Sequence, residues 1–165
     1  MSTVHLICGS TGAGKTTYAM ALSQRIKGIR FSIDEWIGTL FLPDRPAPST
    51  LEWAVERMDR CERHMWTIAD QLIARSVDIV FDWGLSTFAQ RDRFRTRIAQ
   101  TAAESKLHYL DVSRETRRAR ILARLKSDPK SHLFEVTEAM FDAMEGLFEP
   151  PSDDELYGAM IVCED

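Results

Sequence analysis

The feature that most constrains this chain is a glycine-rich stretch near its start. Gly9, Gly14 and Lys15, with Thr16 after them, fit the spacing G-x-x-x-x-G-K-S/T without a mismatch. Glycines let the backbone turn so that successive N–H groups face one anion, and the following helix adds the positive end of its dipole. In such a loop the Lys15 ammonium reaches the β- and γ-phosphates, and the Thr16 hydroxyl is placed to ligate Mg²⁺. The sequence therefore predicts a nucleotide phosphate site made of Gly9, Ser10, Thr11, Gly12, Ala13, Gly14, Lys15, Thr16 and Thr17.

The flanking residues provide the context that this motif requires. Residues 4–8 are a short apolar run that predicts a buried strand, and residues 16–26 carry apolar side chains at helical spacing. A chance match in a chain of this size is on the order of one in a few hundred. We therefore set aside the alternative, a glycine-rich turn with a solvated lysine.

Apolar runs and helical patterns alternate along the rest of the chain. Further strands are expected at residues 29–33, 76–82, 107–112 and 159–163. Helices are expected from Ser49 or Thr50, from Ser86 or Thr87 to about Glu104, from Ser113 to about Lys126, and from Thr137. This alternation predicts a parallel sheet with helices on both faces. The predicted fold class is a single three-layer α/β domain over residues 1–165, with about five parallel strands.

Composition and charge argue against several classes of protein. No apolar run approaches the ~18 residues of a membrane span, and the strand pattern follows residues 1–3 at once, so we expect no signal peptide. Cys8, Cys61 and Cys163 are too widely spaced for a metal site, which predicts reduced thiols in a cytoplasmic protein. The net charge of −4 disfavours duplex nucleic acid as a partner.

Two aspartates stand at the ends of predicted strands. Asp34 follows the run 29–33, and Asp82 closes the run 76–82. Ligands of open parallel sheets bind outside the carboxyl ends of the strands, so both carboxylates are candidates for the site. The alternative for each is a helix N-cap, since aspartate is common where a strand passes into a helix.

The order of these motifs resembles the P-loop kinases of the gluconate kinase, chloramphenicol phosphotransferase, zeta toxin and polynucleotide kinase type. The resemblance covers most of the chain. It is carried by the glycine loop and by Ser32-Ile33-Asp34, Phe81-Asp82-Trp83-Gly84, Arg91-Asp92, Arg120, Arg124 and Phe148-Glu149-Pro150-Pro151. It implies the P-loop NTPase fold with strand order 2-3-1-4-5, and ATP and Mg²⁺ as cofactors.

The resemblance also implies roles for individual residues. Asp34 matches the aspartate that takes the proton of the acceptor hydroxyl, with its neighbour Glu35 as the alternative base. Asp82 would lie beside the glycine loop and help to hold Mg²⁺, directly or through water. Arg120 and Arg124 match the arginines of a lid that closes over the transferring phosphate.

Two segments are expected to cover the site. Residues 36–75 are too long for a simple crossover and are predicted to form a substrate cap, and residues 114–136 are predicted to form the lid. For the lid arginines the alternative is a solvated amphipathic face. Trp36 and Trp83 follow the strand-end aspartates and are placed near substrate. Arg91 is expected to contact the acceptor or a phosphate, or else to lie on the surface.

These observations together predict a phosphotransferase that moves the γ-phosphate of ATP to a hydroxyl of a small molecule. GTP is disfavoured because no N-K-x-D base-recognition sequence occurs. One alternative is a 5′-hydroxyl polynucleotide kinase, which the acidic charge and the lack of a basic, aromatic-interleaved groove pattern disfavour. Another is a nucleotide-binding regulatory module or slow ATPase without a small-molecule acceptor. The sequence leaves the acceptor and the oligomeric state open.

Overall fold

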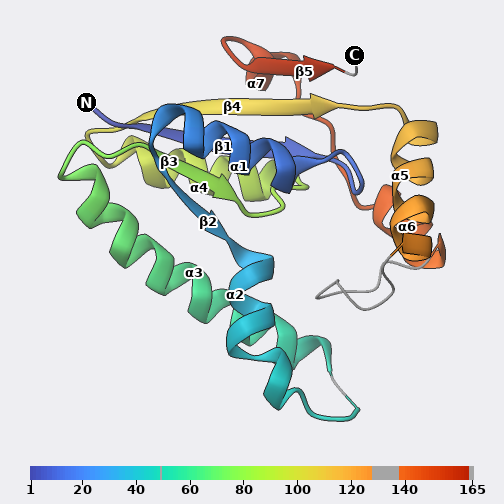
Figure 1. Cartoon of the computed structure of the whole chain (residues 1–165). Helices are drawn as coiled ribbons and strands as arrows, with labels where there is room; N and C mark the ends of the chain where they lie inside the picture. The colour runs from blue at the N-terminus through green and yellow to red at the C-terminus, as the bar shows by residue number, and fades with distance from the viewer. Residues whose placement is uncertain (49, 128–137, 164–165) are drawn as a thin grey trace.

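A parallel sheet of five strands carries the glycine loop at the carboxyl end of its central strand (Figure 1). The structure is a computed structural model that describes residues 1–48, 50–127 and 138–163. The strands are β1 (Thr3–Gly9), β2 (Ile29–Ser32), β3 (Ile79–Asp82), β4 (Glu104–Asp111) and β5 (Met160–Cys163). Their order in the sheet is β2-β3-β1-β4-β5, and every neighbouring pair is parallel. The predicted fold class and strand order, those of P-loop NTPases, are confirmed.

Helices connect the strands and cover both faces of the sheet. They are α1 (Lys15–Ile26), α2 (Ile33–Leu40), α3 (Leu51–Ile73), α4 (Phe88–Ala99), α5 (Arg114–Ser127), α6 (Glu138–Glu145) and α7 (Asp153–Leu156), with a 3₁₀-helix η1 (Leu42–Asp44) after α2. The hydroxyls of Thr50, Thr87 and Ser113 cap α3, α4 and α5, at starts that the sequence predicted. The other predicted starts at Ser49 and Thr137, and lid residues 128–136, lie outside the described residues. None of the described helices combines the length and the apolar composition that a membrane crossing requires.

The structure differs from the sequence prediction near the end of α4. This helix ends at Ala99 rather than near Glu104, because the Thr101 hydroxyl bonds to backbone groups on both sides of it and turns the chain. Glu104 instead begins β4. The sequence prediction also lacks α7, a short helix that starts at a reciprocal capping box between Ser152 and Glu155.

Apolar side chains from alternating strand positions form a core on each face of the sheet. On one face the rings of Phe31, Phe81 and Phe94 pack together with residues of α3. On the other face α1 packs against Ile7 and Val80. Central strands that are buried on both faces are typical of α/β proteins. This packing holds the strands in register, so the side chains at their carboxyl ends meet at one edge.

Two pairs of helices extend beyond that edge. Helix α2 packs against α3, and in Figure 1 both reach past the sheet on the side of β2. Helix α5 packs against α6 beyond the end of β4. The predicted cap, residues 36–75, therefore consists mainly of the end of α2, η1 and α3, and the described part of the predicted lid is α5.

Candidate active site

The glycine loop between β1 and α1 is closed by its own lysine. The Lys15 ammonium donates to the carbonyl oxygens of Gly9 (2.8 Å) and Ser10 (3.0 Å). Gly12 and Gly14 have φ angles of 82° and 89°, a region that residues with a side chain rarely adopt. Gly14 precedes α1 and has no side chain, and no side chain caps the N-terminus of this helix with a hydrogen bond. A helix start of this kind is suited to an anion.

Lys15 lies within electrostatic reach of both strand-end aspartates. Loss of hydration lowers the pKa of its ammonium group, and the carboxylates of Asp82 and Asp34 oppose this shift. The structure therefore brings together the three charged groups that the sequence placed at this edge of the sheet.

Asp82, at the end of β3, is buried next to the loop. Its carboxylate accepts a hydrogen bond from the Arg30 guanidinium (2.9 Å). Burial raises its pKa, and the neighbouring Thr16 hydroxyl and the Arg30 charge oppose this shift. The Thr16 hydroxyl and this carboxylate offer neighbouring oxygen ligands, the kind that Mg²⁺ prefers. Few protein ligands suffice for Mg²⁺, because it also binds phosphate oxygens and water. The residues present thus fit a Mg²⁺ ion, although the described ranges hold no larger cluster of His, Cys, Asp or Glu arranged for a metal.

Asp34 lies in the first turn of α2 and is exposed to solvent. Ser32, and not Asp34, caps this helix: its hydroxyl accepts from the N–H of Glu35 at 3.4 Å. Within the described part of the chain, the Asp34 carboxylate makes no hydrogen bond or ion pair. Its pKa is raised, first because surrounding protein atoms reduce its hydration, and then by the negative charge of Asp82. Asp34 is therefore a carboxylate without a hydrogen-bond or ion-pair partner among the described residues, and its proton affinity is increased.

Arg30, on β2, is a member of the site that the sequence prediction missed. Its guanidinium joins Asp82 to Glu35, with a distance of 2.9 Å between Nη1 and the Asp82 carboxylate. The Arg30 side chain is only 13 % exposed, whereas that of Glu35 is 55 % exposed. A basic residue inside an apolar run is the signal that could have revealed it, because a buried charge needs partners.

The arginines of α5 separate into different environments. Arg120 is exposed, and its Nη1 lies 3.4 Å from the carbonyl oxygen of Ala13 in the glycine loop. Arg124 is also exposed and follows one turn later. Arg117, on the same helix, is buried and pairs with Glu145 at the end of α6. Arg120 is thus an exposed cation in contact with the loop.

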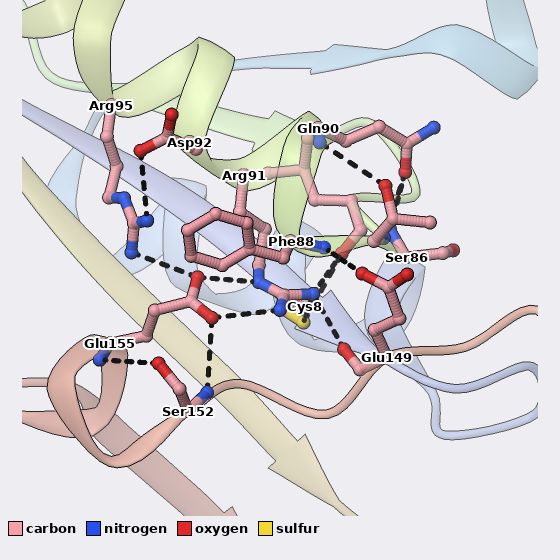
Figure 2. Close-up of polar contacts among 12 residues, drawn as sticks. Cys8, Ser86, Phe88, Gln90, Arg91, Asp92, Arg95, Glu149, Ser152 and Glu155 are labelled. Atoms are coloured by element: carbon pink, nitrogen blue, oxygen red, sulfur yellow. Dashed lines mark hydrogen bonds and ion pairs between the residues drawn. The ribbon is translucent and has the colours of Figure 1, made fainter.

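Arg91 occupies a different place from the one that the sequence suggested. It is fully buried, and its guanidinium donates to the carboxylate of Glu155 and to the carbonyl oxygen of Glu149 (Figure 2). The surface alternative is wrong as well, because the side chain has no exposed area. We therefore leave Arg91 out of the candidate substrate site.

Trp36 and Trp83 lie against each other beside the aspartates. Their ring centroids are 6.4 Å apart in an edge-to-face arrangement. Trp83 is buried, while Trp36 is partly exposed and also faces the ring of His64 on α3, with 6.3 Å between the ring centroids. The two rings thus connect α2 and α3 to the end of β3. Beyond them, a surface cavity of about 490 Å³ is lined by Asp59, Glu62, Arg63, Trp66 and Arg93.

Comparison with known proteins identifies the family. A family model described as "AAA domain" matches residues 4–151. The chain belongs to this AAA domain family. The match spans the glycine loop, the strand-end aspartates, α5 and the segment that contains Arg91. No curated protein sequence gives a significant match to this AAA domain.

Solved structures share the fold of this AAA domain over its whole length. A candidate kinase from Chloroflexus aurantiacus superposes with a TM-score of 0.75 at 14% identity, covering 98% of this chain and 88% of that one. Kti12 from Chaetomium thermophilum, in complex with ADP-AlF3, gives 0.73 at 11% identity, with 98% and 89% covered. The APS kinase CysC from Mycobacterium tuberculosis, in complex with AMPPNP and APS, gives 0.62 at 14% identity, with 99% and 89% covered. These likenesses confirm the predicted resemblance to P-loop kinases at the level of the fold.

Proposed function

We propose that this AAA domain is an ATP- and Mg²⁺-dependent kinase that phosphorylates a hydroxyl of a small molecule. One observation carries the proposal. Asp34 is exposed, has no partner among the described residues, and lies within electrostatic reach of Lys15 in the glycine loop. A carboxylate at that position can accept the proton of a hydroxyl that attacks a phosphate held by the loop.

In the proposed reaction each part of the site has one task. The loop N–H groups and Lys15 hold the β- and γ-phosphates. Thr16 and Asp82 would hold a Mg²⁺ ion, which would neutralise part of the phosphate charge. A bond forms between the acceptor oxygen and the γ-phosphorus while the bond from that phosphorus to the β,γ-bridging oxygen breaks. The hydroxyl proton passes to Asp34, and ADP leaves. Arg120 stabilises the charge on the transferring group.

The position of Asp34 favours this proposal over a regulatory module. In a module without an acceptor, Asp34 would serve as a helix cap, but Ser32 has that role in α2. The alternative of a 5′-hydroxyl polynucleotide kinase is kept as an outcome of the test. The net charge of −4 disfavours it because phosphate backbones bind best to basic surfaces.

The test is ADP release from Mg-ATP by the purified protein, alone and with a panel of acceptors. The panel contains nucleosides, sugars, aminoglycosides, amphenicols and 5′-hydroxyl oligonucleotides. Stimulation by one class of small molecule would support the proposal and identify the acceptor class. Stimulation by oligonucleotides alone would replace it with the polynucleotide alternative. ATP binding without stimulation by any class would favour the regulatory module.

A further inference from the structure

Glu145, the last residue of α6, is bonded to the glycine loop although it lies 135 positions away in the sequence. Its Oε1 accepts a hydrogen bond from the Ser10 hydroxyl at 2.5 Å. The adjacent Met144 sulfur accepts from the Thr11 hydroxyl at 3.7 Å. Arg117 donates to both carboxylate oxygens, with 2.8 Å between Nη2 and Oε2. These hydrogen bonds hold the pKa of Glu145 below its usual value, so the group is a carboxylate at neutral pH.

Arg117 extends the same set of bonds to the backbone. Its side chain is 8% exposed. Nε donates to the carbonyl oxygen of Val112 after β4 (2.9 Å), and Nη1 donates to that of Thr11 in the loop (3.2 Å). One guanidinium thus joins the loop, the end of β4 and α6. The pair also lines a cavity of about 260 Å³ between the loop and the end of β4.

The loop and α5 approach each other closely at this point. A Cβ atom on Gly12 would lie 2.9 Å from the carbonyl oxygen of Arg117. One turn later on the same helix, the Nη1 atom of Arg120 lies 3.4 Å from the carbonyl oxygen of Ala13. A small shift of α5 would therefore strain the loop at Gly12 or withdraw Arg120 from it.

We propose that Arg117 and Glu145 are positioning residues of the nucleotide site. They hold the shape of the glycine loop through Ser10 and Thr11, and they keep α5 at the distance where Arg120 faces the bound phosphates. Neither residue has to touch the nucleotide. The inference rests on the proposed function for the role of Arg120, but its effect on the loop requires only that the loop binds nucleotide.

A second ion pair on the same two helices provides the matched control. Arg114 on α5 and Asp142 on α6 lie 2.7 Å apart, and both side chains are more than half exposed. Arg114 Nε also lies 3.8 Å from Glu145 Oε2, so the control variant is made at Asp142, which leaves the contacts of Glu145 in place. Asp142 is one turn before Glu145. Removal of the Asp142 charge tests whether the loss of any α5–α6 ion pair weakens nucleotide binding. The fold should tolerate this change, because exposed ion pairs contribute little to stability.

The experiment measures the Kd for ADP, with Mg²⁺, of the full chain and its variants, well below the melting temperature of each. Glu145→Gln is expected to raise the Kd at least about 10-fold, as for the loss of a hydrogen bond to a charged group. Asp142→Asn is expected to change it by less than about 2-fold. Ser10→Ala should weaken binding, and its effect should not add to that of Glu145→Gln, because the two side chains share one hydrogen bond.

Two results would overturn the inference. One is an unchanged Kd in Glu145→Gln together with a lower melting temperature, which would make the pair purely structural. The other is an equal change in Glu145→Gln and Asp142→Asn. If Glu145→Gln does not fold, the Kd of Arg117→Lys is measured instead and judged in the same way. Lysine keeps the positive charge but cannot donate to both oxygens of the Glu145 carboxylate as the guanidinium does. Because the readout is nucleotide binding, a lack of phosphotransfer would count against the proposed kinase activity and the role of Arg120, and would leave the effect of Arg117 and Glu145 on the loop intact.

Discussion

Arg91 and Glu155 form a two-point ion pair inside the protein, between α4 and α7. The distances are 2.8 Å from Nε to Oε1 and 2.9 Å from Nη2 to Oε2, and the side chains are 0% and 2% exposed. Arg91 also donates to the carbonyl oxygen of Glu149 at 2.8 Å (Figure 2). The pair therefore fastens the segment after α6 onto α4, and its role is to hold the fold together.

Glu155→Gln is expected to lower the free energy of unfolding by about 3–5 kcal/mol, because it leaves the Arg91 guanidinium buried without its counter-charge. Urea unfolding measures this change. The matched control is Asp92→Asn, which removes an exposed partner of Arg95 on the same helix and should cost less than about 1 kcal/mol. Equal losses in the two variants would contradict the assigned role of the pair.

Asp34→Asn is expected to lower kcat by at least about 10²-fold, the usual contribution of a general base, while the Kd for ATP stays within about 2-fold. Glu35→Gln is the matched control, since this neighbouring carboxylate forms an ion pair with Arg30 and is not expected to act as the base. Steady-state kinetics with an acceptor found by the panel measure both. If Glu35→Gln loses transfer and Asp34→Asn keeps it, the base is Glu35.

The pH profile provides a second test of the same assignment. The pKa of Asp34 is raised above 3.8 by reduced hydration and by Asp82. The base acts when deprotonated, so kcat/KM should fall as the pH falls through this raised pKa. Glu35→Gln should retain that acidic limb, and Asp34→Asn should lose it.

The parts of the fold that follow local rules were predictable from the sequence. The glycine spacing, the alternation of apolar runs with helices, and the hydroxyl caps at Thr50 and Thr87 each rest on residues that are close together in the chain. The strand order came from the family resemblance. The end of α4 was missed because a single hydroxyl, that of Thr101, decides where the chain turns.

Contacts between distant residues were not predictable in this way. Asp34, Asp82 and Lys15 meet because strand ends share one edge of a parallel sheet, which is a rule of topology. No such rule joins Glu145 to Ser10, or Arg91 to Glu155, since both pairs depend on how helices pack after the chain has folded. Helical spacing alone also could not show that Arg117 of α5 is buried while Arg120 and Arg124 of the same helix are exposed.

Phosphotransfer is expected to require Mg²⁺ and to stop when the ion is removed with EDTA. Asp82→Asn should raise the Mg²⁺ concentration for half-maximal activity about 10-fold, because it removes the carboxylate charge beside Thr16. Glu35→Gln is the control, since this carboxylate also contacts Arg30 but lies outside the proposed metal site. Titration of activity with Mg²⁺ at saturating ATP measures the shift, and the same midpoint for Asp82→Asn and wild type would contradict the metal assignment.

Protein stability is expected to fall as the pH drops from about 6.5 to about 4. His108 is buried between His5 and the Tyr18 hydroxyl, at 2.8 Å from each. Burial, with His5 next, lowers the pKa of His108 to about 4. Between that value and the ordinary 6.5, His108 is protonated in the unfolded chain but neutral in the folded one. Protonation of the unfolded chain therefore lowers the free energy of unfolding by about 3 kcal/mol in total over this range.

Urea unfolding at several pH values measures this dependence. His108→Gln should flatten the slope between pH 4 and 6.5 even if it lowers the overall stability. His64→Gln, which changes an exposed histidine, should leave the slope unchanged. An unaltered slope in His108→Gln would mean that other groups cause the dependence.

Arg120→Ala is expected to lower kcat about 10²-fold with a smaller change in the Kd for ATP, because its charge acts on the transferring phosphate more than on the bound nucleotide. The control is Arg114→Ala on the same helix, which removes an exposed guanidinium paired with Asp142 and, at 3.8 Å, with Glu145, but leaves the cation beside Ala13 in place. Single-turnover transfer at saturating ATP separates the chemical step from binding. A kcat for Arg120→Ala equal to that of Arg114→Ala would show that the exposed arginine beside Ala13 is solvated surface and not part of the reaction.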